Sequence, residues 1–250
     1  MAGNENGLVK LGTTSALMGD GETGRNSPKS VVPNESGRPK LLDLFCGAGG
    51  ASMGYHRAGF EVEGVDIKPQ PHYPFKFYQA DALEFPLGGY DAYHASPECK
   101  KWSVASRIHG GEYPDQVTPI RQRLIEIGKP YVIENVGAAP LKNPYMLCGT
   151  MFGLKVRRHR YFECSFDIYF FPACCACKGK DGYTNSRSGF SAFKNGAKLI
   201  TVGGHNFAVD DARLAMGIYW TNQLGLSQAI PPAYTEYIGK YLMKVLNESR

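Results

Sequence analysis

Apolar residues between positions 40 and 136 gather in four short segments that contain some polar residues and are followed by glycine or polar residues. The segments cover residues 41–45, 60–67, 90–95 and 131–136. Runs of this length, bounded by turn residues, are typical of strands that are buried on both faces. We therefore predict a strand at each of these four positions.

Apolar residues with helical spacing lie between these runs and after them. The spacing predicts helices at residues 51–58, 121–127, 210–216 and 233–246. Chains in which strands alternate with helices build a parallel sheet with helices on both faces. The pattern therefore predicts an α/β fold with a mostly parallel sheet.

Two segments depart from this pattern. Residues 1–38 are rich in Gly, Asn, Ser, Thr and Pro and bury too little apolar surface to offset the entropy of ordering, so we expect a disordered tail. Residues 164–206 show no clear period, which predicts a small irregular insertion. The remainder divides into a main domain at residues 39–163 and a C-terminal return to it at residues 207–250.

Composition and charge limit the number of domains, the cellular location and the kinds of partner that we expect. The 250 residues are 43% hydrophobic and 20% charged, which suits one globular domain with a small insertion. No run of about 18 apolar residues and no secretory signal occurs, so we expect a cytoplasmic protein with reduced cysteines and no membrane contact. The net charge of +5 permits a polyanionic partner but does not demand one.

Basic residues gather in two stretches. The first contains Lys100, Lys101, Arg107, Arg121 and Arg123. The second contains Lys155, Arg157, Arg158 and Arg160. A solvated surface would also carry such residues, but both stretches adjoin the candidate chemical motifs, which favours contacts with nucleic-acid phosphates.

A glycine-rich turn follows the first predicted strand. The string Asp-Leu-Phe-Cys-Gly-Ala-Gly-Gly at residues 43–50 lets a ligand approach the backbone and exposes amide donors at a helix start. Asp66 ends the next strand about 20 residues later, where a carboxylate can accept hydrogen bonds from ribose hydroxyls. Asp81 follows a further strand and could bind an adenine amino group. An ordinary glycine turn is the alternative, but the whole string with Asp66 behind it favours a nucleotide-type cofactor.

Three polar groups occupy positions from which they could share a crevice at the carboxyl edge of the sheet. Cys99 follows the strand at residues 90–95, and the lysines after it would favour its reactive thiolate. Glu134 ends another strand, where burial is costly unless the carboxyl group is used. Arg158 and Arg160 would share one face of a strand and suit a phosphate or a carboxylate. The alternatives are an inert cysteine, a surface glutamate and a charged strand face.

In this order, the strings resemble the motifs of the cytosine-5 DNA methyltransferase family over about residues 40–163 and 213–246. The glycine string matches the cofactor motif of the family. Four further family motifs are matched, by Pro-Glu-Cys at residues 97–99, Glu-Asn-Val at 134–136, Arg-His-Arg at 158–160 and Ala-Ile-Pro-Pro at 229–232. The departures are Glu98 between the usual Pro and Cys, Lys100 and Val156 in place of Gln, and Ser227-Gln228 in place of Gly-Asn. A carboxylate at Glu98 would raise the pKa of the Cys99 thiol unless the lysines compensate.

The resemblance implies a Rossmann-like methyltransferase fold that binds S-adenosylmethionine and methylates carbon 5 of cytosine in double-stranded DNA. It implies a covalent bond from Cys99 to carbon 6 of a flipped-out base, with Glu134, Arg158 and Arg160 as further catalytic residues. The implied cofactor-binding residues are Asp43, Leu44, Phe45, Gly47, Gly49, Gly50, Asp66, Ile67, Asp81, Ala82, Pro97, Gln228 and Ala229. The expected DNA-binding residues are Lys100, Lys101, Arg107 and Arg187.

The insertion at residues 164–206 would then read a short target sequence. We expect a monomer, and such an enzyme would serve a restriction–modification system or protect a phage genome. Three other functions stay open. They are methylation of cytosine in RNA, binding of nucleic acid without catalysis, for which Glu98, Val156 and Gln228 would argue, and transfer of a group other than methyl.

Cysteines cluster within the insertion. Cys174, Cys175 and Cys177, with Cys164 or His205 as a further ligand, could hold zinc and stiffen a segment too small for a core of its own. Because the spacing is not a pair of Cys-x-x-Cys motifs, we expect free thiols and no metal, with zinc as the less favoured alternative.

Overall fold

The computed structural model describes residues 37–102, 113–170, 172–177, 183–184, 192 and 198–248. Arg107 and Arg187, two predicted DNA-binding residues, lie outside these ranges, as do residues 1–36 of the predicted tail. Arg38, at the end of that tail, is held in place, because its guanidinium donates hydrogen bonds of 2.7–3.0 Å to three backbone carbonyl groups of residues 56–60. The packed structure therefore begins before the predicted start at residue 39.

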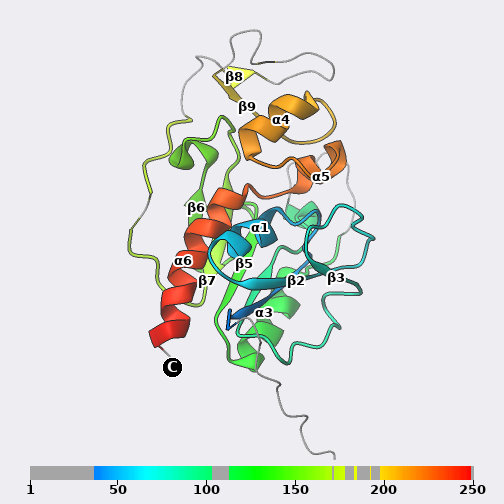
Figure 1. Ribbon diagram of the computed structural model, residues 1–250, viewed down its shortest axis with the longest axis vertical. Coiled ribbons are helices and arrows are strands. Elements are labelled where there is room, and N and C mark those ends of the chain that lie inside the picture. The colour runs from blue at the N-terminus through cyan, green and yellow to red at the C-terminus, as the bar shows by residue number, and fades with distance from the viewer. Residues whose placement is uncertain are drawn as a thin grey trace, which may run out of the picture. The chain divides into compact units, whose positions relative to one another are not determined.

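Seven strands form one sheet in the described part of the chain (Figure 1). In chain order they are β1 (Lys40–Leu44), β2 (Glu61–Asp66), β3 (Lys76–Gln79), β4 (Ala92–Ala95), β5 (Tyr131–Asn135), β6 (Tyr145–Leu147) and β7 (Arg160–Cys164). Their order across the sheet is β3-β2-β1-β4-β5-β7-β6. Neighbours from β3 to β5 run parallel, and β7 runs antiparallel to β5 and β6. The prediction of a mostly parallel sheet is therefore confirmed.

Helices cover both faces of this sheet (Figure 1). The helices of the described residues are α1 (Gly50–Arg57), α3 (Val117–Ile127), α4 (Val209–Met216), α5 (Gln223–Gln228) and α6 (Pro232–Glu248), with the 3-10 helices η1 (Lys100–Trp102) and η2 (Gly149–Phe152). The helices α1 and α6 pack together on one face, and α3 lies on the other. No helix in the described ranges is both long enough and apolar enough to cross a membrane.

The alternation of side chains along each strand divides the core into two layers. In β1, Leu41 joins the cluster under α1 and α6, which includes Tyr55 and Tyr234. Leu42 and Leu44 join the cluster under α3. Because successive strand residues point to opposite faces, a run that is apolar throughout is buried on both sides.

A third apolar cluster joins β9 (Leu199–Ile200) to α4 and α5 through Ile200, Phe207, Met216 and Leu226. The strand β9 pairs in parallel with β8 (Tyr183–Thr184), and Ile200 also forms a bridge with Val156. Residues on both sides of the expected boundary at position 206 share this cluster. The described end of the insertion therefore packs with the segment that follows it.

Two predicted elements differ from the structure at their starts. The helix α3 begins at Val117, about one turn early, because the Asp115 carboxylate accepts hydrogen bonds from the first-turn N–H groups of Val117 and Thr118. The strand β7 begins at Arg160, so Arg158 precedes the strand. The prediction that Arg158 and Arg160 share a strand face is therefore wrong.

Candidate active site

A cavity of about 300 Å³ opens at the carboxyl ends of β1, β2, β4 and β5. The strand order reverses between β1 and β4, and open parallel sheets bind ligands at such a switch point. The predicted site residues that line the cavity are Phe45, Gly47, Gly50, Asp66, Ile67, Asp81, Ala82, Pro97, Cys99, Glu134, Arg160, Gln228 and Ala229. The cavity thus brings most of the expected cofactor residues together with three of the four expected catalytic residues.

Three predicted cofactor residues lie behind the cavity rather than in its lining. Asp43 is buried in β1 and accepts a hydrogen bond from the Ser52 hydroxyl. The carbonyl oxygen of Leu44 accepts a hydrogen bond of 3.0 Å from the N–H of Ser96. Gly49 precedes α1 with a φ of 81°. These residues shape the turn, so direct contact between them and a ligand in the cavity is not supported.

The turn after β1 forms one wall of the cavity. Phe45 has a φ of 58°, a left-handed conformation that is uncommon outside glycine and recurs at functional sites. The N–H of Gly47 donates to the Asp66 carboxylate at 3.0 Å. A Cβ at Gly50 would collide with the backbone oxygen of Ile230, which precedes α6. The turn, the Asp66 carboxylate and the chain before α6 therefore fit closely together.

The loop after β4 carries Cys99 into the cavity wall. The side-chain amide of Asn135, at the end of β5, donates to the carbonyl oxygen of Pro97 at 2.9 Å. The Gln116 side chain accepts a hydrogen bond of 3.0 Å from the N–H of Glu98. Asn135 and Gln116 therefore hold the backbone on the N-terminal side of Cys99.

The unexpected Glu98 has a charged partner. Its carboxylate lies 3.7 Å from the Nζ of Lys68, and its side chain is 46% exposed. A carboxylate that is paired and hydrated perturbs a neighbouring group less than a buried one does. Glu98 is therefore a paired, partly hydrated charge in the cavity wall rather than a buried one.

Glu134 and Arg160 form an ion pair in the cavity wall. Arg160 Nε lies 3.0 Å from Glu134 Oε1, and Glu134 is 6% exposed. Burial raises the pKa of Glu134, while the positive charges of Arg160 and Arg158 and a hydrogen bond with Ser96 oppose that rise. Because its pKa is raised, Glu134 holds a proton more readily than an exposed glutamate does. It can therefore share a proton with a basic group that binds in the cavity.

Arg158 lies outside the cavity lining and joins distant segments. Its guanidinium donates to the carbonyl oxygens of Val202 and, at 2.9 Å, Ser227. Its own carbonyl oxygen accepts a hydrogen bond of 2.6 Å from the Tyr234 hydroxyl. Burial, followed by the nearby charge of Arg160, lowers its pKa to about 9. These contacts are those of a positioning residue.

A buried chain of polar side chains, which the motifs do not indicate, leads from α1 to Glu134. The Tyr55 hydroxyl lies 3.0 Å from Nδ1 of His94, and Nε2 of His94 lies 2.8 Å from the Ser96 hydroxyl. Ser96 in turn hydrogen-bonds Glu134. Burial lowers the pKa of His94 to about 3, so the imidazole is neutral near pH 7. A polar residue inside the apolar run at 90–95 is the signal that could have found it.

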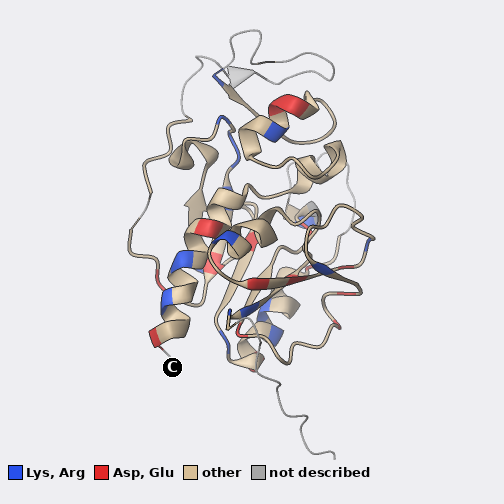
Figure 2. Cartoon of the chain, viewed as in Figure 1, with Lys and Arg blue, Asp and Glu red and all other residues tan. Residues whose placement is uncertain are grey.

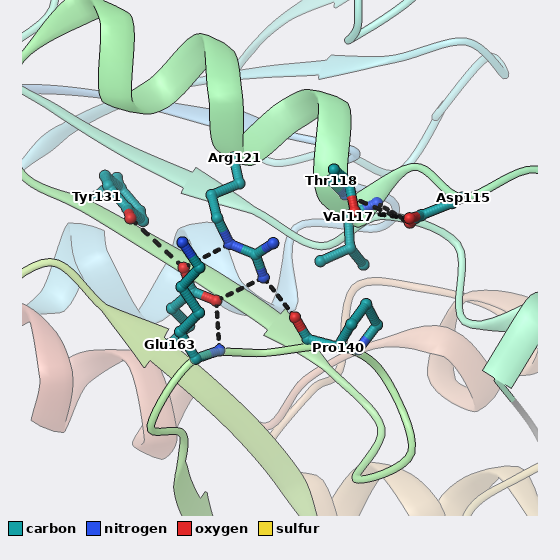
Figure 3. Close-up of polar contacts among 8 residues, drawn as sticks. Asp115, Val117, Thr118, Arg121, Tyr131, Pro140 and Glu163 are labelled. Atoms are coloured by element: carbon teal, nitrogen blue, oxygen red, sulfur yellow. Dashed lines mark hydrogen bonds and ion pairs between the residues drawn. The ribbon is translucent and has the colours of Figure 1, made fainter.

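Two arginines of the first basic stretch, Arg121 and Arg123, make contacts that hold the fold together. The Nε and Nη2 atoms of Arg121 donate to the two carboxylate oxygens of Glu163 at 2.8 and 2.7 Å, and Nη2 also donates to the carbonyl oxygen of Pro140 (Figure 3). Arg121 is 7% exposed, so the expectation that it contacts nucleic acid is wrong. Arg123 donates to backbone carbonyl oxygens of residues 82 and 85.

The lysines that follow Cys99 lie in η1. Lys101 is exposed, with its Nζ 5.2 Å from the centre of the Trp102 ring. The side chain of Lys100 and all of Arg107 fall outside the described part of the structure. Figure 2 shows further Lys and Arg residues along the segment that enters β7, and acidic residues, which are Asp210 and Asp211, at the start of α4.

The described cysteines do not gather as the sequence suggests. Cys174 is exposed and stands apart from a group formed by Cys175, Cys177, Cys148 and His159. Neither Cys164 nor His205 belongs to that group. Of the ligand set considered from the sequence, Cys175 and Cys177 belong to the group, whereas Cys174 and both alternatives for the fourth ligand do not.

Known proteins with the same fold include three methyltransferases. No protein-family model and no curated protein matches the chain. A solved structure assigned as a DNA modification methyltransferase encoded within an E. coli prophage is 15% identical, with a TM-score of 0.59, over 84% of this chain and 99% of that one. The S. pombe Dnmt2 methyltransferase is 12% identical, with a TM-score of 0.57, over 84% and 100%. The Entamoeba histolytica methyltransferase EhMeth is 12% identical, with a TM-score of 0.54, over 84% and 99%. The chain therefore has the Rossmann-like fold of these methyltransferases.

Proposed function

We propose that this protein is an S-adenosylmethionine-dependent methyltransferase that modifies carbon 5 of cytosine in DNA. The observation that carries the proposal is a single cavity lined both by the glycine turn with Asp66 and by Cys99, Glu134 and Arg160. A cofactor and a base held in one cavity can be oriented for direct group transfer. The fold shared with known methyltransferases agrees with this proposal.

The residues beside the glycine turn fit S-adenosylmethionine. The Asp66 carboxylate, held by the N–H of Gly47, can accept hydrogen bonds from ribose hydroxyls. Asp81 accepts one backbone hydrogen bond through Oδ1 and has a second oxygen for the adenine amino group. Phe45 and Ala229 add apolar wall. When bound, the cofactor supplies a methyl group that its sulfonium makes electrophilic.

On the other side of the cavity, Cys99 is the proposed nucleophile. Its thiolate would bond to carbon 6 of cytosine, which breaks the aromaticity and makes carbon 5 electron-rich. Glu134 would bind N3 and the exocyclic amino group, and its raised pKa favours a proton shared with N3. Arg160 would keep the Glu134 carboxyl group oriented. After methylation, a base removes the proton on carbon 5, the double bond to carbon 6 re-forms, and the thiolate leaves.

A cytosine in a duplex must be flipped out of the stack to reach such a cavity. Lys100 and Lys101, directly after Cys99, would bind phosphates beside the flipped nucleotide, and Arg107 and Arg187 would add contacts. Residues 164–206 would read the surrounding bases. A monomer acting on double-stranded DNA accounts for these roles.

The test is to incubate the full chain with S-adenosylmethionine and unmodified duplex DNA, digest to nucleosides and weigh the products. Wild type should yield 5-methyldeoxycytidine and Cys99→Ala none, whereas Tyr219→Phe, which alters an exposed ring outside residues 164–206, should match wild type. Duplex DNA with 5-fluorocytosine should trap a covalent adduct, because fluorine cannot leave as the proton does. That adduct should be absent with Cys99→Ala.

Three results would replace the proposal. Methylation of an RNA oligonucleotide with no methylation of DNA would make the protein an RNA enzyme. Binding of the cofactor and of DNA without any product would make it a silent binding protein. A cytosine product with a mass gain other than one methyl group would change the transferred group.

A further inference from the structure

Four potential metal ligands lie together outside the cavity, within the described residues. The donor atoms of Cys148, His159, Cys175 and Cys177 all lie within 4.8 Å of one another. The Nε2 atom of His159 is 3.0 Å from the Sγ of Cys177 and 3.5 Å from the Sγ of Cys175. The residues come from three places in the chain, namely the residue before η2, the residue before β7 and the irregular segment after β7.

The distance between two of the sulfur atoms is informative. The Sγ atoms of Cys175 and Cys177 lie 3.1 Å apart, and both cysteines are free thiols. A disulfide would place them about 2.0 Å apart. Two thiolates bound to one tetrahedral zinc ion, at about 2.3 Å each, lie about 3.8 Å apart. The observed separation is nearer to that of two ligands of one ion.

We propose that Cys148, His159, Cys175 and Cys177 bind one zinc ion in a structural site. Three thiolates and one imidazole are a common ligand set for tetrahedral zinc. Four protein ligands leave no position open for a substrate, so the site would stabilise structure rather than perform chemistry. The burial of Cys148 and Cys177 would shield the metal bonds from solvent.

Thr150 supports the sulfur ligands from outside the group. Its hydroxyl lies 3.4 Å from the Sγ of Cys148 and 3.7 Å from the Sγ of Cys175. The hydroxyl oxygen accepts a hydrogen bond of 3.1 Å from the N–H of Ala176. Hydrogen bonds to coordinating atoms orient them and tune their affinity for metal.

The site would fasten a segment that has little structure of its own. The described residues between 165 and 177 contain no helix or strand, and Tyr169 and Phe170 are about three-quarters exposed. Small segments without a core are commonly held by a metal. His159 also lies between Arg158 and Arg160, so a metal bond there would fix the backbone from which both arginines extend.

The test is the metal content of the full chain, purified from zinc-supplemented medium and passed through gel filtration with a weak chelator. We expect about one zinc ion per chain in wild type and in Cys174→Ser, and roughly tenfold less in Cys148→Ser and Cys177→Ser. The Cys174→Ser control is closely matched, because Cys174 is adjacent to Cys175 yet exposed and outside the group. Equal zinc in Cys174→Ser and Cys177→Ser would overturn the assignment.

A second measurement on wild type decides the matter where the cysteine variants fail to fold. The protein is stripped of metal and titrated with Co²⁺, which should produce the visible absorption of tetrahedral cobalt with thiolate ligands. About one equivalent of zinc should abolish that absorption, and zinc should raise the melting temperature. Wild type that retains no zinc and gives no cobalt spectrum would refute the site. Neither readout depends on methyl transfer.

Discussion

At the residue scale, two buried titratable groups behind the cavity have opposite pKa shifts. Asp43 and His94 lie directly opposite each other on β1 and β4, and both are fully buried. Burial raises the pKa of Asp43 to about 7, opposed by the Ser52 hydroxyl and aided by nearby carboxylates. Burial lowers the pKa of His94 to about 3. Each group thus favours its neutral form, which limits the charge next to Glu134.

Replacing either group should change how stability depends on pH. The raised pKa of Asp43 stabilises the fold below pH 3.8, and this contribution is lost as the pH rises through about 7. The lowered pKa of His94 stabilises the fold above pH 6.5, and this contribution is lost as the pH falls towards 3. From pH 7 to pH 5, Asp43 should add about 2 kcal/mol to the free energy of unfolding and His94 should remove about 2 kcal/mol.

Urea unfolding at pH 7 and pH 5 measures these contributions. Relative to wild type, His94→Gln should gain stability on going to pH 5, because the Asp43 contribution remains. Asp43→Asn should lose stability over the same interval, because the His94 contribution remains. The double variant, His94→Gln with Asp43→Asn, measures the pH dependence of stability that comes from all other groups of the protein. The same pH dependence in wild type and both single variants would contradict the prediction.

At the element scale, buried strands were easier to predict than edge strands. The strands β1, β2, β4 and β5 are largely buried; apolar residues dominate the interiors of β1, β4 and β5, and they alternate with charged residues in β2. The edge strands β3 and β6 are short and partly exposed, which leaves too few residues to establish a period. A strand before Asp81 was expected without bounds, and β3 lies there. The helix α5 was missed, although the Asn222 side chain caps it.

Site residues that belong to local sequence patterns could be predicted, whereas contacts between distant segments could not. Asp66 and Glu134 lie at strand ends and Cys99 lies in the loop after β4, so their order along the chain indicates their place in the fold. Contacts between residues that are distant in the sequence produce no local sequence pattern. Examples are Lys68 beside Glu98 and His159 beside Cys177. Sequence periodicity reports on one element at a time, whereas these pairs depend on how separate elements pack.

The packing of α1 against α6 depends on a glycine. A Cβ at Gly54 would collide with the hydroxyl of Thr235 and the carbonyl oxygen of Pro232 at the start of α6. Gly54→Ala should therefore lower the free energy of unfolding by about 1–3 kcal/mol, despite the better helix propensity of alanine. Gly88→Ala is the matched control, because nothing lies within 4 Å of its added Cβ. Equal stability of the two variants, measured by urea unfolding, would show that α1 and α6 can separate at little cost.

At the scale of the whole described chain, the C-terminal region returns to the glycine turn. The indole N–H of Trp220 donates to the carbonyl oxygen of Ala48 at 2.8 Å, across 172 positions of sequence. The Thr235 hydroxyl donates to the carbonyl oxygen of Ala51 at 2.8 Å, across 184 positions. Trp220 packs against the apolar cluster of α4 and α5, so that cluster is tied directly to one wall of the cavity. The shape of the proposed cofactor site thus depends on residues far from its motifs.

This dependence predicts a loss of cofactor affinity from a change outside the motifs. Trp220→Phe keeps an aromatic ring against the cluster but removes the hydrogen bond to Ala48. A neutral hydrogen bond contributes about 0.5–1.5 kcal/mol, so the Kd for S-adenosylmethionine should rise about two- to tenfold. The rate at saturating cofactor should change little, because Cys99, Glu134 and Arg160 are not altered. Calorimetric titration with S-adenosylmethionine measures the Kd, and Tyr219→Phe, which changes an exposed neighbouring ring, is the control. An unchanged Kd in Trp220→Phe would mean that the glycine turn keeps its shape without the C-terminal region.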